Sequence, residues 1–359
     1  MSDAIIMPRA GAREAARGDQ ILRLGLLVAG LAIGLLPIYR YLGSMIWFRE
    51  YLGDYKVFWG IGSAPLEWVY GHYGFPYPPT ALLLVRPFGL LPFWPSLVAW
   101  GLAGAIAISI AARRMTGPGG LAVGFVTAAG VGVLAGGQIS LFIGSLVIDG
   151  VSAASPRWRG ALLAAGAVIK PQSLLAAPVA LIAERNWRAI AWSVATGCGL
   201  LLLSVLVLGV DTWIRWATEI HKFPGYLTSR GIDRTDVGVY GLARTLGLPG
   251  WTFLVGIPLG IATSWLVFRK ASAPVDRYAA FAASTVLMSP YTLSYDLAGL
   301  TFACVAMLLD SKRSPLIWLA AALVVSSVFA NVGIILMAVM LSYEALSNSR
   351  TASSAASPR

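Results

Sequence analysis

Apolar runs follow one another almost without interruption from Ile21 to Ser347, and this feature constrains the fold more than any other. A helix needs about 20 apolar residues to cross a bilayer, and this chain of 359 residues supplies many such runs. Only 12% of its residues are Asp, Glu, Lys or Arg, whereas soluble domains carry about 25%, so a fully water-exposed surface is excluded. The sequence therefore predicts an all-α polytopic membrane protein.

Basic residues and prolines divide the apolar sequence into about twelve predicted membrane-spanning helices. These lie near residues 21–40, 94–112, 119–135, 138–154, 159–170, 172–184, 189–210, 250–268, 278–290, 294–310, 315–330 and 332–347. The run at 80–91 is too short for an ordinary span, and we expect a half-helix that enters the membrane from outside. We predict a single transmembrane domain over 21–347, a basic cytoplasmic leader at 1–20 and a disordered tail at 348–359.

The distribution of Lys and Arg predicts the orientation in the membrane. If the N-terminus is inside, 17 of the 27 basic residues fall on the inner side and 10 on the outer side. Because positive charge concentrates in cytoplasmic loops, both chain ends are expected in the cytoplasm and the bundle in the plasma membrane. Two polar stretches, 43–79 and 211–249, then lie outside, and we expect them to carry short amphipathic helices and the chemistry.

Charge and cysteine content exclude several classes of partner. The net charge of +11 is explained by loop charge and by attraction to anionic headgroups, so we expect no nucleic-acid partner. The two cysteines, Cys198 and Cys304, lie inside apolar runs without metal-ligand spacing. We expect no metal and no cofactor, and the sequence does not fix an oligomeric state.

Asp54 is the first candidate for chemistry, because it lies among aromatic and charged residues shortly after the first predicted span. An acidic side chain buried at the membrane surface has a raised pKa, which suits a general base. A solvated loop carboxylate or a helix cap is the alternative. His72 and Tyr77 lie in an aromatic segment that suits either a sugar ring or anchoring at the headgroups. His72 has no second ligand nearby, so a metal site is not predicted.

Arg86 and Lys170 are predicted at membrane depth, where a cation is costly unless it meets a carboxylate or a bound anion. We expect both to bind a lipid phosphate, with snorkelling to the interface as the alternative. Gln138 lies at the same predicted depth, where it suits either a ligand hydroxyl or helix packing. Arg215 and Lys222, in the second polar stretch, are further candidates for the phosphate.

A polar turn late in the chain carries Tyr291, Tyr295 and Asp296. Asp296 is expected to act as a second acidic group or as the partner of one of the cations. Capping of the following helix is equally consistent with its position. All three residues are candidates for substrate binding.

Several short motifs follow one another along residues 20–310. They are Asp54, Tyr-Pro-Pro at 77–79, Pro-Phe-Gly-Leu-Leu-Pro at 87–92, Gly-Gln at 137–138, Lys-Pro at 170–171, Glu-Arg-Asn-Trp-Arg at 184–188 and Ser-Pro-Tyr at 289–291. In this order they resemble glycosyltransferase family 87, part of the GT-C group of mannosyltransferase-like membrane enzymes that use polyprenyl-phosphate sugars.

The resemblance implies an extracytoplasmic active site in which Asp54 is the general base. It also implies a polyprenyl-phosphate hexose as donor, with mannose as the expected sugar, and a lipid-linked or envelope glycan as acceptor. Transfer would be inverting, without a nucleotide sugar or a required metal. Some relatives carry His in the late polar turn, where this chain has Tyr295 and Asp296, which puts an identical proton-transfer arrangement in doubt.

Two other functions are consistent with parts of the sequence. A lipid-linked sugar flippase or transporter also needs many spans and interior cations, but it would place charges along a path through the membrane. Most of the unusual polar residues here are predicted at one face, which favours an enzyme. An O-antigen-ligase-like enzyme would rely on an outer His and Arg, such as His221 with Arg215.

Overall fold

The computed structural model describes residues 10–48, 53–72, 75–229, 236–270 and 272–355. Over these residues the chain is built of helices and contains no β-strand, which confirms the all-α prediction. Five helical segments are long and apolar enough to cross a membrane: Ala16–Pro37, Phe93–Phe125, Trp187–Leu208, Gly250–Arg269 and Ala330–Ser347. Four further apolar helices have only 10–17 residues, so the twelve predicted spans are not confirmed.

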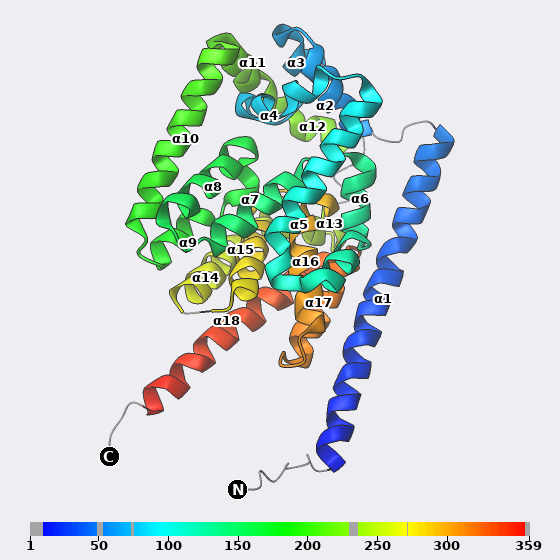
Figure 1. Ribbon diagram of the computed structural model, residues 1–359, viewed down its shortest axis with the longest axis vertical. Coiled ribbons are helices and arrows are strands. Elements are labelled where there is room, and N and C mark those ends of the chain that lie inside the picture. The colour runs from blue at the N-terminus through cyan, green and yellow to red at the C-terminus, as the bar shows by residue number, and fades with distance from the viewer. Residues whose placement is uncertain (1–9, 49–52, 73–74, 230–235, 271, 356–359) are drawn as a thin grey trace, which may run out of the picture.

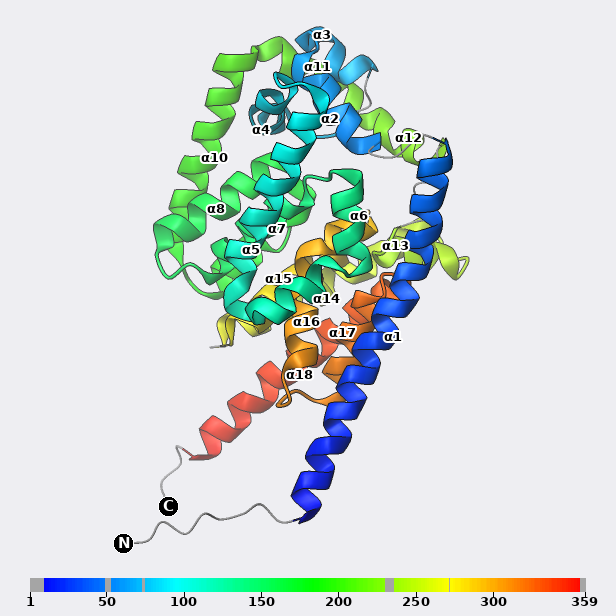
Figure 2. The same ribbon diagram turned by 45° about the vertical axis from the view of Figure 1, so that its right-hand side comes forward.

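The helices differ widely in length. The longer ones are α1 (Ala10–Phe48), α5 (Phe93–Phe125), α10 (Trp187–Leu208) and α18 (Ala330–Ala355). The shorter ones are α2 (Gly53–Ser63), α3 (Leu66–His72), α4 (Pro79–Gly89), α6 (Ala128–Gly136), α7 (Ser140–Ser152), α8 (Pro156–Ile169), α9 (Ala177–Ala183), α11 (Val210–Glu219), α12 (Phe223–Ser229), α13 (Val239–Thr245), α14 (Gly256–Arg269), α15 (Pro274–Met288), α16 (Ala298–Leu309) and α17 (Pro315–Val325). Figures 1 and 2 show α2, α3, α4 and α11 gathered at one end of the molecule, and the start of α1 and the end of α18 at the other.

Several boundaries differ from the prediction for local reasons. The helix α5 is interrupted at Gly117, whose backbone (φ 65°, ψ 176°) is not helical, and this break falls in the predicted gap between the spans at 94–112 and 119–135. The second of these spans is itself divided, because α5 ends at Phe125 and the nine-residue α6 follows it. The C-terminal helix α18 continues to Ala355, past the point where we predicted disorder, and α1 already begins inside the predicted leader. The eleven-residue α4 is too short to span a membrane.

The helix α10 forms one edge of the bundle in Figure 1, opposite α1. Its apolar side chains Leu202, Leu206 and Val207 are exposed rather than packed in a core. A helix that is apolar on its exposed face is stable against lipid but not against water. The arrangement is that of a membrane protein, with lipid covering this edge.

Three short helices connect two polar clusters. The helices α8, α15 and α16 have 14, 15 and 12 residues, or about 21, 22 and 18 Å of length. The first turns of α8 and α15 carry Arg159 and Arg277, which bind Glu184; we call this end the Glu184 face. The far end of α8 leads to Lys170, and that of α15 to the turn with Asp296; we call this end the Asp54 face.

Candidate active site

Asp54 lies in the first turn of α2, where the positive end of the helix dipole favours a carboxylate. The next residue, Tyr55, is fully buried and anchors this turn. Its ring lies 5.9 Å from that of Trp100, and its hydroxyl donates a hydrogen bond of 2.5 Å to Oγ of Ser96. Ser96 in turn donates to the carbonyl oxygen of Phe88 at 2.5 Å. The start of α2 is therefore fixed against α4 and α5.

The turn after α6 brings Gln138 to Asp54. The helix ends at Gly137 in the left-handed conformation (φ 65°), where a side chain would place its Cβ only 2.5 Å from Cβ of Tyr55. Trp100 Nε1 donates a hydrogen bond of 2.9 Å to the carbonyl oxygen of Gly137 and holds the turn in place. The buried amide of Gln138 then donates from Nε2 to Oδ2 of Asp54.

Lys170 is the buried cation of the site, with 3% of its side chain exposed. Because Pro171 disfavours a helical conformation at the preceding residue, α8 stops and Lys170 turns away (φ −141°, ψ 81°). Its Nζ forms an ion pair with Asp296 and lies 5.7 and 5.5 Å from the ring centroids of Tyr77 and Tyr295. The carboxylate and the two aromatic faces offset the loss of hydration.

Asp296 is oriented by several donors. It lies in a short 3₁₀ turn, η5 (Ser294–Leu297), where Oδ1 accepts from Oγ of Ser140 at 3.0 Å and from Lys170. Its other oxygen accepts from the backbone N–H of Leu293 at 3.3 Å. The structure thus favours the prediction that Asp296 is the partner of a cation, while its hydrogen bond to Leu293 also caps the turn.

Asp236 holds the neighbouring backbone. Its carboxylate accepts from the N–H groups of Gly238 at 2.7 Å, Gly241 at 3.0 Å and Thr292 at 2.9 Å, and a single antiparallel bridge links it to Leu293. Sequence reasoning placed Asp236 in a polar stretch without a role. An Asp followed two residues later by Gly is typical of a turn that the carboxylate stabilises, and this pattern could have identified the role of Asp236 from the sequence.

The charges around Asp54 act on its proton affinity. Burial raises the pKa of Asp54 to about 6, the positive charge of Lys170 lowers it, and the negative charge of Asp296 raises it. Asp54 is exposed to water, although protein atoms crowd around its carboxylate. Burial also raises the pKa of Tyr77 well above its ordinary value, and the charges of Asp296 and Asp54 raise it further, so Tyr77 keeps its hydroxyl proton. Asp54 can therefore accept a proton near neutral pH.

Tyr291 lies at the edge of the same site. Its hydroxyl accepts a hydrogen bond of 3.1 Å from Nε2 of Gln172, a residue that sequence reasoning missed. Both side chains, with Asp296, line a cavity of about 50 Å³. The cavity is large enough for water but not for a sugar.

Three predicted site residues, Arg86, Arg215 and Lys222, are not brought into this cluster. Arg86 donates to the carbonyl oxygens of Ala64 at 3.0 Å and Ile61 at 3.4 Å, roughly 10–15 Å from Asp54 along the direction of α2. Lys222 is exposed and pairs with Glu219 at 2.8 Å.

Arg215 is exposed on α11, which contacts the Tyr77 segment through a 3.3 Å hydrogen bond from Trp216 Nε1 to the Pro76 carbonyl oxygen. His72 ends α3, and its side chain lies outside the described residues. The roles of Arg86, Arg215, Lys222 and His72 in substrate binding stay predictions.

The described residues contain no group of three or more His, Cys, Asp or Glu side chains that could hold a metal ion. The chemistry available from this part of the chain is that of one carboxylate beside a buried ion pair, with two tyrosine rings near the ammonium group.

Comparison with known proteins identifies the family. The family model of glycosyltransferase family 87 matches residues 75–290, which is more than half of the chain. The matched range contains Tyr77, Gln138 and Lys170 but neither Asp54 nor Asp296. A search of curated proteins and a search of solved structures each find no match. The chain belongs to glycosyltransferase family 87 and is a membrane glycosyltransferase.

Proposed function

We propose that the enzyme transfers a hexose, with mannose as the expected sugar, from a polyprenyl-phosphate donor to a lipid-linked or envelope glycan acceptor. The observation that carries this proposal is the position of the Asp54 carboxylate beside the buried Lys170–Asp296 ion pair. Such a transfer needs a base for the acceptor hydroxyl and a cation for the leaving phosphate. The Asp54 face supplies one of each.

In the proposed reaction, Asp54 accepts the proton of the acceptor hydroxyl as its oxygen attacks C1 of the hexose. The bond between C1 and the phosphate oxygen breaks, and its electron pair leaves with the polyprenyl phosphate. A single displacement of this kind inverts the anomeric centre. In this proposal Asp54 takes the proton and Lys170 faces the leaving phosphate, so we expect the reaction to require neither a metal nor a cofactor.

Lys170 is proposed to stabilise the leaving phosphate. An ammonium group has three N–H donors, and Asp296 engages Lys170 while leaving donors for an incoming oxygen. The rings of Tyr77 and Tyr295 both contact the Lys170 ammonium group, and Tyr295, which is the less buried of the two, is proposed to stack against the sugar while Tyr77 supports the cation. Gln138 fixes the direction of the Asp54 carboxylate.

We also propose that the Asp54 face is extracytoplasmic and that both chain ends lie in the cytoplasm of the cell. The 17 basic residues predicted on the inner side include Arg159, Arg277 and Arg313. All three belong to ion-pair networks away from the Asp54 face. This grouping supports the orientation expected from the positive charges of the loops. The short apolar helices would then complete a GT-C-like bundle of about twelve spans.

A flippase is less consistent with the packing between the two faces. The helices that connect the clusters bury Leu163, Phe281 and Leu287, and the buried polar side chains Ser284 and Thr285 on α15 carry no charge. A transport path for a charged headgroup would need charged or strongly polar groups there. The alternative of a ligase with His221 and Arg215 is supported only by exposure, because both side chains are exposed on the second polar stretch.

The experiment is a transfer assay with the full-length enzyme in nanodiscs. Polyprenyl-phosphate mannose, polyprenyl-phosphate glucose and a nucleotide-linked mannose would be offered with envelope glycolipids as acceptors, and the products analysed by mass spectrometry. We expect transfer from a polyprenyl-phosphate sugar alone, and an inverted linkage by NMR. Transfer from the nucleotide sugar, or retention of configuration, would contradict the proposal.

A further inference from the structure

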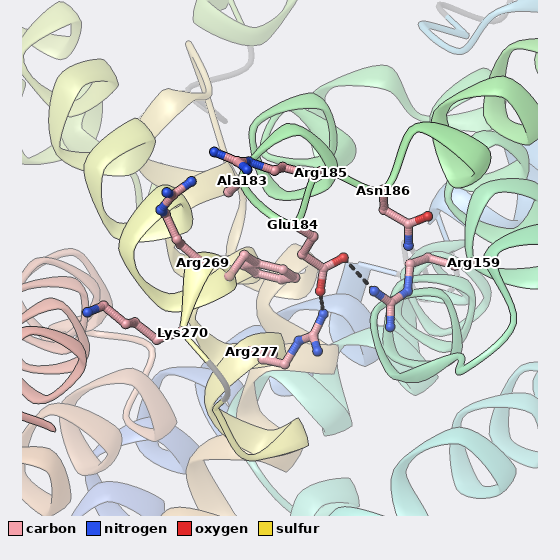
Figure 3. A pocket seen from close by; sticks show the side chains of 9 residues that line it. Arg159, Ala183, Glu184, Arg185, Asn186, Arg269, Lys270 and Arg277 are labelled. Carbon is pink, nitrogen blue, oxygen red and sulfur yellow. Dashed lines mark hydrogen bonds and ion pairs between the residues drawn. The ribbon is translucent and has the colours of Figure 1, made fainter. Parts of the chain in front are cut away.

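The Glu184 face carries a pocket that lies outside the candidate active site (Figure 3). Its volume is about 630 Å³. Five basic side chains and one carboxylate line it, an excess of four positive charges. They are Arg159, Arg185, Arg269, Lys270, Arg277 and Glu184.

Glu184 does not neutralise this excess. It lies between Arg159 and Arg277 and forms an ion pair with each, as the two dashed lines in Figure 3 show. No carboxylate within the described ranges pairs with Arg185, Arg269 or Lys270. Two of these three, Arg185 and Arg269, are also exposed, so a bound anion can reach them. The pocket therefore offers cationic groups without a protein anion.

Arg277 has unused donor capacity. Its Nε is buried and has no hydrogen-bond partner among the described residues, and its guanidinium lies 5.0 Å from the ring centroid of Phe268. Burial, followed by the charge of Arg159, lowers the pKa of Arg277 to about 10. An unpaired buried N–H is costly, and two close guanidinium groups repel each other. A bound anion would relieve both effects.

Exposed tryptophans indicate the environment of the pocket. Trp158 and Trp187, at the starts of α8 and α10, are 58% and 63% exposed, and Arg269 lies over the ring of Trp265 at 5.9 Å. Exposed tryptophan beside arginine is typical of the level of lipid headgroups. The opening of the pocket is therefore expected where phosphate groups of lipids are abundant.

We propose that this pocket binds a phosphate group, supplied by a phospholipid headgroup or by a free phosphate compound. Guanidinium groups match phosphate oxygens two at a time, and four of the five cations are arginines. The volume exceeds that of a phosphate ion and leaves room for the substituent that carries it. This site shares no residue with the proposed transfer site.

The test compares binding to the full-length protein in phosphatidylcholine nanodiscs at constant ionic strength set with sodium chloride. One arm adds phosphatidic acid to the discs and the other adds inorganic phosphate to the buffer. The triple variant Arg185→Gln/Arg269→Gln/Lys270→Gln spares the Glu184 ion pairs and should fold. The control Arg157→Gln/Arg188→Gln removes charge from the start of α8 and α10 without touching the lining of the pocket.

We expect wild type and control to bind alike, and the triple variant to bind about tenfold more weakly or worse. Binding in the lipid arm alone identifies a headgroup as the ligand, and binding of inorganic phosphate identifies a free compound; both support the site. Equal weakening in the control and the triple variant would show general attraction to a basic surface and overturn the proposal. Absence of binding by the wild type in both arms would also overturn it.

Discussion

The Asp54 face and the Glu184 face are both built around a carboxylate bound to a cation, but the balance of charge is opposite. On the Asp54 face, two carboxylates lie near one ammonium group, and the second carboxylate raises the pKa of the first. On the Glu184 face, two guanidinium groups share one carboxylate, and three further cations line the pocket. The group in excess determines the chemistry, which is proton acceptance on one face and anion binding on the other.

The largest expected effect comes from removing the excess carboxylate. We expect Asp54→Asn to lower turnover about 100- to 10,000-fold, because the amide keeps the shape of the side chain but cannot accept a proton. The measurement is hexose transfer by the purified variant, with thermal unfolding beside it. Glu67→Gln, at an exposed position on α3, is the matched control and should leave both unchanged. Asp54 is not the base if Asp54→Asn keeps more than about a tenth of wild-type turnover.

The two faces should also differ in how they tolerate loss of a cation. Lys170→Met leaves Asp296 buried without its ion pair, so we expect the free energy of unfolding to fall by about 3–5 kcal/mol. Arg277→Met leaves Arg159 on Glu184, and we expect a smaller loss of about 1–3 kcal/mol. Adding Asp296→Leu to Lys170→Met should restore part of the stability. An equal loss for the two single variants in denaturant titrations would contradict the comparison.

A pH profile tests the raised pKa on the Asp54 face. Asp54 acts when deprotonated, so kcat/KM should be constant above its pKa of about 6 and fall as the pH drops below it. At one pH unit below the pKa, kcat/KM should be about tenfold lower than on the plateau, because the deprotonated fraction of Asp54 is about tenfold smaller there. A profile flat down to pH 4.5 would mean that the kinetically important group is not Asp54.

The smallest effect on turnover is expected at Arg86. Its guanidinium binds one carbonyl oxygen in the last turn of α2 and one just after that helix, so we expect Arg86→Gln to cost about 1–3 kcal/mol of stability. The donor KM of the same variant tests the prediction that Arg86 binds the lipid phosphate, because an unchanged donor KM would contradict it. Arg86→Lys should recover little of the lost stability, because an ammonium group cannot reproduce the planar, forked arrangement of the guanidinium N–H donors. A selective rise of the donor KM, with unchanged stability, would instead place Arg86 on the phosphate.

These residues also show how far the sequence predicts the molecule. The types and predicted depths of Asp54, Gln138 and Lys170 were enough to nominate them, and the structure brings all three to one face. Arg86 was predicted at the same depth, yet its side chain turns toward the end of α2. Depth follows from hydropathy, whereas the direction of a side chain depends on which helix packs beside it.

Helix boundaries were predicted less well than helix content. The twelve predicted spans rest on the length of apolar runs. The break at Gly117 in α5 falls where the sequence places a gap, but α6 stops after nine residues because Gly137 adopts a left-handed conformation against Tyr55. Such stops depend on contacts that form only in the folded chain. The role of Asp236 could not be predicted for the same reason, because its carboxylate binds the backbone of Thr292, which is 56 residues away in the chain.

The short helices between the two faces have a consequence for the surrounding lipid. The hydrocarbon layer of a bilayer is about 30 Å thick. The helices α8, α15 and α16 measure about 18–22 Å, roughly 10 Å less than this layer, whereas the lipid-facing α10 has 22 residues and measures about 33 Å. Because α16 and most of α15 are buried inside the protein, they do not thin the bilayer, but they hold the two faces closer together than the two headgroup levels. The donor headgroup therefore has to descend below its usual level to reach Lys170. Turnover should accordingly depend on the acyl-chain length of the host membrane, and short-chain lipids should favour it.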